Sequence, residues 1–232
     1  MVMVYADGAD YESMVDLNNN EVICGFTTNP TLMRQANVKN YEAFAKKVLA
    51  QIKFKPISFE VFADDFNEMH RQAIKITSWG QNVNVKIPIT NTKGETSKNL
   101  IKDLTNQNVK CNVTAIFTKS QVKEVLEVID KSSDLILSVF AGRIADTGVD
   151  PIPMIKDIVD ITKEYKNIKI LWASTRELLN INHATLSGCH IITVTPDMIK
   201  KMSNLNKDLT VFSKETVKMF FDDAYKSGYV IN

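Results

Sequence analysis

The sequence predicts a (β/α)8 TIM barrel, an α/β fold that would occupy residues 1–232 as a single domain. Eight short apolar runs alternate with amphipathic segments, and no Pro- or Gly-rich linker divides the chain. A length of 232 residues is also typical of one undivided barrel. An open doubly wound sheet is the alternative. It ranks lower because no G-x-G-x-x-G or G-x-x-x-x-G-K-[ST] motif follows any apolar run.

The predicted strands are short runs rich in aliphatic residues, as expected for a parallel sheet that is covered on both faces. They are expected at residues 2–7, 21–29, 57–63, 83–89, 110–117, 135–142, 169–174 and 190–195. The helices between them are expected at residues 9–17, 41–52, 65–79, 95–107, 119–130, 151–165 and 175–187.

Several of these helices begin with recognisable capping residues. Asp150 before Pro151 places a carboxylate ahead of a proline in the first turn, and Ser174 before Thr175 is expected to cap the next helix. In segment 65–79, apolar residues recur every three or four positions, as on a helix that packs against a sheet. Residues 203–232 form a C-terminal helical extension. The aromatic face of its segment 209–225 is expected to cover one end of the barrel or a neighbouring subunit.

Composition excludes several classes of partner. The formal net charge is +1, from 28 Lys+Arg and 27 Asp+Glu, so no bulk field would attract nucleic acid or an acidic membrane surface. The N-terminal sequence lacks the basic start and long apolar run of a secretory signal, and no window of about 18 apolar residues predicts a membrane span. We therefore expect a soluble, cytoplasmic protein.

The three cysteines predict neither a disulfide framework nor a metal site. Cys24, Cys111 and Cys189 are far apart and show no C-x-x-C spacing. Cys24 and Cys111 fall in apolar strands, where thiols are usually buried. None of the three histidines lies among the residues that we expect to act in catalysis.

Segment 82–89, NVNVKIPI, is a predicted strand with a lysine at its centre. Alternation places Asn84, Lys86 and Pro88 on one face, and only valine and isoleucine side chains on the other. Lysine is seldom buried. Considered alone, this segment is best interpreted as an exposed edge strand with Lys86 in water. A buried Lys86 would need a partner or a function.

Polar residues recur at the C-terminal ends of the predicted strands, where barrel active sites form. Seven of the eight strands carry them: Asp7, Thr27 to Asn29, Glu60, Lys86, Asn112 with Thr114, Ser138 to Arg143, and Ser174 with Arg176 just beyond. Singly, such residues usually serve turns, helix caps or surface ion pairs. Together, one amine, two carboxylates, several amides and hydroxyls, and two arginines predict a shared site at one end of the barrel.

These motifs, in this order along the chain, resemble transaldolase. The matching segments are GFTTNP from Gly25 to Pro30, KIP from Lys86 to Pro88, CN-x-T from Cys111 to Thr114, S-x-F-x-G-R from Ser138 to Arg143, and AS-x-R from Ala173 to Arg176. The short chain is similar to the small transaldolase subfamily, which also contains fructose-6-phosphate aldolases.

The resemblance implies that a dihydroxyacetone unit is moved between sugar phosphates without metal or cofactor, through a Schiff base on Lys86. This chemistry needs a neutral amine, a form that burial favours. Asp7 would take and return the proton of the donor's C4 hydroxyl, and Glu60 with Thr114 would hold a proton-carrying water.

The resemblance also implies which residues bind substrate. Asn29 and Asn112 would hold sugar hydroxyls, and Ser174, Arg143 and Arg176 would bind the distal phosphate. The remaining residues assigned to substrate binding are Thr27, Ser138 and Phe140. Small transaldolases commonly form pentamers or decamers through the C-terminal helix, so a homo-oligomer is expected.

Two positions distinguish the activities of the subfamily. Aldolases that release free dihydroxyacetone typically pair a glutamine with a tyrosine where this chain has Glu60 and Phe140, whereas transaldolases have the glutamate and the phenylalanine. The resemblance therefore implies a transaldolase of the pentose phosphate pathway. The donor would be sedoheptulose 7-phosphate or fructose 6-phosphate, and the acceptor glyceraldehyde 3-phosphate or erythrose 4-phosphate. A fructose-6-phosphate aldolase, a different Schiff-base aldolase and a phosphosugar-binding barrel without turnover are the alternatives.

Overall fold

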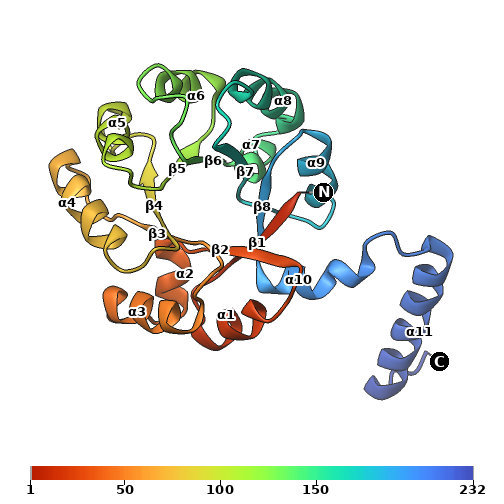
Figure 1. Ribbon diagram of the computed structural model, residues 1–232. Coiled ribbons are helices and arrows are strands. Elements are labelled where there is room, and N and C mark those ends of the chain that lie inside the picture. The colour runs from red at the N-terminus through yellow and green to blue at the C-terminus, as the bar shows by residue number, and fades with distance from the viewer. Residues whose placement is uncertain (1, 232) are drawn as a thin grey trace. The chain divides into compact units, whose positions relative to one another are not determined.

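The computed structural model describes residues 2–231, and its eight parallel strands close into a barrel in sequence order. Figure 1 shows the ring of strands with helices around its outside. The predicted (β/α)8 fold is confirmed. Because a closed barrel has no edge strand, segment 82–89 is not the exposed edge strand that it resembles when considered alone, and Lys86 lies inside the barrel, as the strand-end residues taken together predict.

All eight expected strands are present, and each is shorter than expected. They are β1 Met3–Asp7, β2 Ile23–Thr27, β3 Ile57–Glu60, β4 Val83–Pro88, β5 Cys111–Ile116, β6 Leu135–Val139, β7 Ile168–Trp172 and β8 Ile191–Val194. Several polar residues that were expected at strand ends therefore lie in the loops and short helices that follow the strands.

The seven helices expected between the strands and the expected C-terminal helix are also present, together with three short helices that the sequence pattern does not predict. The helices are α1 Tyr11–Asn18, α2 Pro30–Gln35, α3 Tyr41–Gln51, α4 Phe66–Thr77, α5 Lys98–Asn106, α6 Lys119–Leu126, α7 Ala141–Ala145, α8 Pro151–Thr162, α9 Asn180–Leu186, α10 Pro196–Lys201 and α11 Leu209–Ser227. The unexpected ones are α2, α7 and α10. Each has six residues or fewer, too few for a helical period to be recognised.

Of the two predicted helix caps, one is confirmed and one is wrong. The carboxylate of Asp150 accepts a hydrogen bond from the backbone N–H of Ile152 at 2.9 Å, at the start of α8. Ser174 does not cap a helix, because α9 begins only at Asn180. Instead Ser174 has a left-handed backbone with φ of 62°. Its carbonyl oxygen lies so close to Gly142 that a Cβ added to this glycine would be only 1.6 Å from it. Close contact between this loop and helix α7 therefore shapes the segment around Ser174.

The barrel interior has an apolar layer below its polar residues. This layer includes Tyr5, Ile136, Leu171, Ala173 and Ile191. Tyr5, Ile136 and Ile191 each lie two positions before a polar residue of the same strand, so both members of each pair point inward. A Cβ on Gly25 would lie 2.6 Å from the Tyr5 ring, so glycine leaves the room that this ring occupies.

The outward faces of the strands pack against the helices. In β4, Val85 and Ile87 are fully buried, and α4 buries Met69, Ala73 and Ile76 on the face of its apolar stripe. The valines and isoleucines of β4 therefore belong to the layer between sheet and helices. As a consequence, Asn84 and Lys86 face the barrel interior.

The cysteines are free, and their burial differs from the prediction at one position. Cys111 and Cys189 are buried, but Cys24 is exposed. Cys24 alternates with the inward-facing Gly25, so it points out of the barrel, where the surrounding helices leave it uncovered. Burial raises the pKa of the Cys111 thiol to about 12, which keeps it protonated and unreactive at neutral pH.

The chain divides into two compact units, Met1–Ile199 with the barrel and Lys200–Asn232 with α11. The predicted C-terminal extension, which begins at residue 203, lies within the second unit. In α11, large apolar side chains are exposed, among them Leu209, Phe220, Phe221 and Tyr225. The expectation that this face covers a barrel end or another subunit stays a prediction. Within residues 2–231, no helix combines the length and apolar character needed to cross a membrane.

Candidate active site

A cavity of about 420 Å³ opens at the carboxyl ends of the strands, a volume in the usual range of small-molecule sites. Eleven of the twelve predicted site residues line it, and Asn112 does not. Those that line it are Asp7, Thr27, Asn29, Glu60, Lys86, Thr114, Ser138, Phe140, Arg143, Ser174 and Arg176. The structure therefore brings together residues that are up to 169 positions apart. This agrees with the strand-end rule, by which polar residues at the C-terminal ends of barrel strands share one site.

Strand register explains why these side chains meet. Glu60 of β3 pairs with Lys86 of β4, and Lys86 pairs with Asn112 of β5. Beside β3 in the barrel, Asp7 of β1 pairs with Thr27 of β2. Since paired residues of parallel strands lie at one level and point the same way, each pair enters the interior side by side.

Lys86 is buried and its amine has two partners. Only 7% of the residue is exposed, and its Nζ donates a hydrogen bond to the carbonyl oxygen of Thr28 at 2.8 Å. The same nitrogen lies 3.1 Å from Oε2 of Glu60. A buried ammonium needs such partners. A carboxylate at this distance can also accept its proton, leaving a neutral amine that can attack a carbonyl carbon.

Asp7 lies in an environment that favours its protonated form. Burial raises the pKa of the Asp7 carboxyl, while the charge of Lys86 and the hydrogen bonds from Thr27 and Asn29 act in the opposite direction. The Thr27 hydroxyl donates to Oδ1 of Asp7 at 2.8 Å. A carboxyl with a raised pKa in a cavity is suited to taking up and returning a proton during a reaction.

Thr114 presents a hydroxyl that is not used elsewhere in the fold. Its Oγ1 is buried and has no hydrogen-bond partner among residues 2–231, although the residue lines the cavity. Leaving a buried hydroxyl unpaired costs about 1–3 kcal/mol. The Thr114 hydroxyl is therefore well suited to binding a substrate hydroxyl or a water molecule.

Asn112 lies behind the cavity wall rather than in it. The residue is fully buried, and its Nδ2 donates to Oγ of Ser58 at 3.0 Å. Its Oδ1 accepts a hydrogen bond from Oγ of Ser138 at 2.6 Å. Both ends of the amide are thus used inside the protein, so the geometry does not favour the predicted contact of Asn112 with a sugar hydroxyl. Asn112 instead holds Ser138, which lines the cavity.

Asn29 combines a structural contact with a place in the cavity. Its Oδ1 accepts a hydrogen bond from the backbone N–H of Leu32 at 3.0 Å, which caps α2. The side chain also hydrogen-bonds Asp7. The amide oxygen is therefore already used by the helix, and Asn29 helps to orient the Asp7 carboxyl.

The predicted phosphate-binding residues lie together on the side of β6 and β7. The Arg143 guanidinium lies 5.6 Å from the centroid of the Phe140 ring. Arg176 pairs with Asp146, an acid that the sequence did not indicate, with Nη2 2.5 Å from Oδ2. About half of each side chain in this pair is exposed, and exposed pairs contribute little to stability. An incoming phosphate can therefore compete with Asp146 for Arg176.

Among the residues near the site that were not predicted, Thr193 and Tyr41 make hydrogen bonds to predicted site residues. Thr193 of β8 lines the cavity, and its hydroxyl hydrogen-bonds that of Thr27. The strand-end rule that selected the other residues would have found it. Tyr41 of α3 hydrogen-bonds the backbone of Glu60. No sequence pattern indicates Tyr41, because it comes from a helix.

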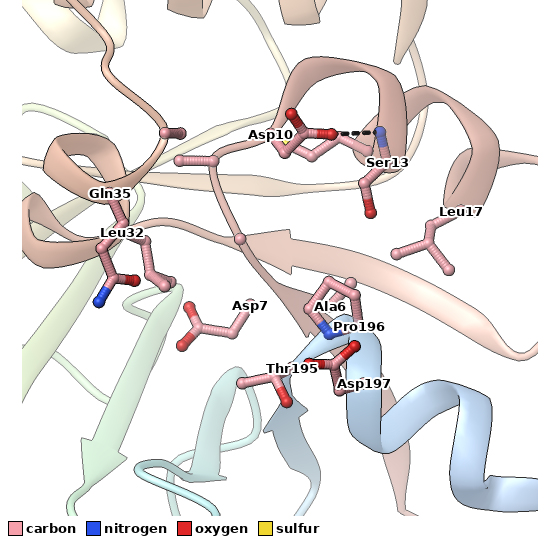
Figure 2. A pocket seen from close by; sticks show the side chains of 14 residues that line it. Ala6, Asp7, Asp10, Ser13, Leu17, Leu32, Gln35, Thr195, Pro196 and Asp197 are labelled. Carbon is pink, nitrogen blue, oxygen red and sulfur yellow. Dashed lines mark hydrogen bonds between the residues drawn. The ribbon is translucent and has the colours of Figure 1, made fainter. Parts of the chain in front are cut away.

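A second cavity, of about 470 Å³, adjoins the first at Asp7. The two cavities share Asp7, Leu32, Gln35 and Thr195. Figure 2 shows the Asp7 carboxylate between the side chains of Leu32 and Gln35 on one side and Thr195 on the other. Asp7 is thus accessible from two cavities while the rest of its surroundings remain buried.

Comparison with known proteins identifies related sequences over most of the chain. The family model described as Transaldolase/Fructose-6-phosphate aldolase matches residues 4–230. A probable transaldolase of Nitrosopumilus maritimus is 31% identical over 86% of this chain and 86% of its own length. A probable transaldolase of Dehalococcoides mccartyi is 32% identical over 86% of this chain and 89% of its own length. A probable transaldolase of Bartonella henselae is 27% identical over 97% of both chains.

Among solved structures, thiamine phosphate pyrophosphorylase from Pyrococcus furiosus is similar in fold. The TM-score is 0.55 over 84% of this chain and 85% of the other, with 11% sequence identity. At this identity the likeness concerns the barrel architecture alone.

Proposed function

Because the chain belongs to the transaldolase/fructose-6-phosphate aldolase family, we propose that it transfers a dihydroxyacetone unit from a ketose phosphate to an aldose phosphate. The observation that carries the proposal is the buried amine of Lys86, 3.1 Å from the Glu60 carboxylate and inside the cavity. A lysine in this setting is suited to Schiff-base formation with a ketone.

In the first step, the neutral Lys86 amine attacks the C2 carbonyl carbon of the donor. The new C–N bond forms as the nitrogen loses a proton, for which Glu60 is the nearest carboxylate. The carbinolamine hydroxyl then leaves as water when it receives a proton, and the C=N bond of the Schiff base forms. Glu60 and the unpaired hydroxyl of Thr114 are positioned to move these protons through a water molecule.

In the second step, Asp7 accepts the proton of the C4 hydroxyl as the C3–C4 bond breaks. The bonding electrons pass to the protonated Schiff base, which becomes an enamine, and the first aldose phosphate leaves. The enamine carbon then attacks the aldehyde of the acceptor, and Asp7 returns its proton to the new hydroxyl. Hydrolysis of the Schiff base releases the product ketose. The raised pKa of Asp7 supports this role, because a carboxyl whose pKa lies above its ordinary value holds and returns a proton more readily at neutral pH.

Substrate recognition would rest on the polar wall of the cavity. Thr27, Asn29 and Ser138 offer groups for sugar hydroxyls, while Arg143, Ser174 and Arg176 form a site for the terminal phosphate. The Arg176 guanidinium would exchange Asp146 for phosphate oxygens, or bind both with its several N–H groups.

Phe140 supports transfer rather than release of free dihydroxyacetone. Its ring lies in the cavity wall and packs against Phe117 with 5.8 Å between ring centroids. A phenyl ring has no hydroxyl with which to protonate the enamine or hold a water beside it. The enamine would therefore persist until an aldehyde arrives. A fructose-6-phosphate aldolase is the second candidate, since the family includes that activity.

The test is trapping with borohydride in the presence of fructose 6-phosphate, followed by peptide mass mapping. We expect a reduced dihydroxyacetone adduct on Lys86, and none in Lys86→Ala. Product analysis with and without erythrose 4-phosphate then separates the two activities. Equal turnover without the acceptor, with free dihydroxyacetone released, would contradict the transferase assignment, and no adduct would favour the binding barrel.

We also propose that the protein acts in the cytoplasm as a homo-oligomer. The exposed apolar side chains of α11 support an assembly, since such surfaces commonly form contacts between subunits. Light scattering after size-exclusion chromatography measures the mass, and a monomer of 26.2 kDa at micromolar concentration would contradict the proposal.

A further inference from the structure

Tyr41, the first residue of α3, makes an unusual pair of hydrogen bonds with Glu60. Its hydroxyl accepts from the Glu60 backbone N–H at 2.8 Å and donates to the Glu60 carbonyl oxygen at 3.2 Å. Tyr41 itself does not line the active-site cavity. It lines a separate cavity of about 400 Å³, and Glu60 is the one residue common to the linings of these two cavities. Tyr41 therefore acts on Glu60 from outside the site.

Tyr41 also contacts the residue that supplies the other partner of Lys86. Burial raises the pKa of the Tyr41 phenol, while hydrogen bonds with the Glu60 backbone and the Thr28 side chain act against this. The carbonyl oxygen of Thr28 accepts the hydrogen bond of the Lys86 amine at 2.8 Å. The Lys86 nitrogen is thus held by the Thr28 carbonyl and the Glu60 carboxylate. The Tyr41 hydroxyl contacts both Thr28 and Glu60.

The ring of Tyr41 is held in place by other aromatic side chains. Its centroid lies 4.5 Å from that of Phe62, 5.6 Å from that of Trp79 and 6.0 Å from that of Phe59. The contacts with Phe59 and Trp79 are edge-to-face, a favourable geometry for aromatic pairs. A ring that is packed on several sides keeps its hydroxyl in one position.

We propose that Tyr41 is a positioning residue for Schiff-base formation. It joins the ends of β2 and β3 so that the Thr28 carbonyl and the Glu60 carboxylate both reach the Lys86 nitrogen. Proton transfer between Lys86 and Glu60 depends on this geometry, because small displacements of reacting groups lower rates steeply. The inference rests on the proposed function of Lys86.

The experiment compares Tyr41→Phe with a matched control, Tyr165→Phe. Both variants keep an aromatic ring and lose a hydroxyl that donates to a backbone carbonyl, since Tyr165 donates to Leu126 at 3.1 Å. Each protein is mixed with fructose 6-phosphate and quenched with borohydride at successive times. The adduct on Lys86 is measured by peptide mass mapping and divided by the folded fraction from circular dichroism.

We expect Tyr41→Phe to form the adduct about 10- to 100-fold more slowly than the wild type, the range expected for a displaced reacting group. Tyr165→Phe should keep the wild-type rate. The KM for fructose 6-phosphate should change little in either variant, because the phosphate-binding side chains are untouched. A merely structural role would lower the melting temperature of both variants without this selective loss of rate.

Two results would overturn the inference. One is a wild-type rate in Tyr41→Phe, and another is an equal loss of rate in Tyr165→Phe. If Tyr41→Phe does not fold at the assay temperature, its rate of adduct formation is compared with that of the wild type at a lower temperature at which both are folded. A wild-type rate in Tyr41→Phe there would overturn the inference.

The outcome for the wild-type protein separates this inference from the proposed function. If the wild type forms no adduct on Lys86, the proposed function itself fails. If the wild type forms the adduct and Tyr41→Phe forms it equally fast, the proposed function stands and only the role of Tyr41 fails.

Discussion

The buried pair of Lys86 and Glu60 gives a quantitative prediction about stability. We consider Lys86→Met and Glu60→Gln, singly and combined. Each single variant removes one charge and leaves the other inside the barrel, where the two side chains are 8% and 17% exposed. Coulomb's law with an effective dielectric constant of about 20 gives an attraction of about 5 kcal/mol at the observed separation of 3.1 Å. Desolvation of the two charges offsets part of this attraction.

We therefore expect each single variant to lose about 3 kcal/mol of unfolding free energy, at the lower end for breaking a buried pair. This corresponds to a decrease in melting temperature of about 6–12 °C for a chain of this size. The double variant should lose less than the sum of the two singles, because it leaves no unpaired charge. We expect a coupling energy of about 2 kcal/mol.

The assay is urea unfolding of the four proteins, followed by circular dichroism and by tryptophan fluorescence, with thermal melts in parallel. Phosphate-free buffer avoids stabilisation by a bound anion. The Thr28 carbonyl remains in all four proteins. Proteins that share the same residue at position 86 therefore make the same contact with this carbonyl, and it does not contribute to the effect of Glu60→Gln. A coupling energy below about 0.5 kcal/mol, within the usual scatter of additive mutations, would refute the reasoning that the two groups form a charged pair.

Three further predictions concern the site and its support. Asp7→Asn should lower transfer by about 10²- to 10⁴-fold, the usual contribution of acid–base catalysis, as measured in a coupled assay. It should not lower the melting temperature at pH 7, because burial raises the pKa of Asp7 and the ionised form opposes folding; a lower melting temperature would contradict this. Gly142→Ala should raise the KM for fructose 6-phosphate at least tenfold, since its Cβ would force away the carbonyl of Ser174, and an unchanged KM would count against the phosphate site. Burial and the nearby Lys169 lower the pKa of His190, whose Nδ1 accepts a hydrogen bond from the Ile170 N–H. The neutral imidazole of His190 should therefore contribute to stability at pH 7.5, and this contribution should decrease as the pH falls below 6.5. His190→Gln should reduce this pH dependence of the melting temperature relative to a control variant of the half-buried His70, His70→Gln, and equal profiles would refute it.

The sequence determined the barrel and most of its cavity wall. Eight apolar runs with helical segments between them are a long-range pattern, and such a pattern is satisfied by closing a parallel sheet. Once the sheet closes, residues near the strand ends must meet at one mouth. Asp7, Glu60 and Lys86 could therefore be assigned to a common site from their positions in the chain alone.

Local features that depend on contacts between loops could not be predicted. The short helices α2, α7 and α10 are too brief to show a period. Ser174 resembles a helix cap in the sequence, yet its left-handed backbone follows from the close approach of Gly142, a residue 32 positions away. Cys24 belongs to an apolar run, but its exposure depends on which part of the barrel the helices cover.

Only the tertiary structure decided what each polar side chain does. Asn112 and Ser138 have the same kind of position in the sequence pattern, but Asn112 uses both ends of its amide inside the wall and Ser138 reaches the cavity. Tyr41 comes from a helix outside the sheet and has no strand-end position at all, yet its hydroxyl holds the backbone of Glu60. Periodicity indicates which face a residue is on. Hydrogen-bond partners depend on distances between segments that only the folded chain brings together.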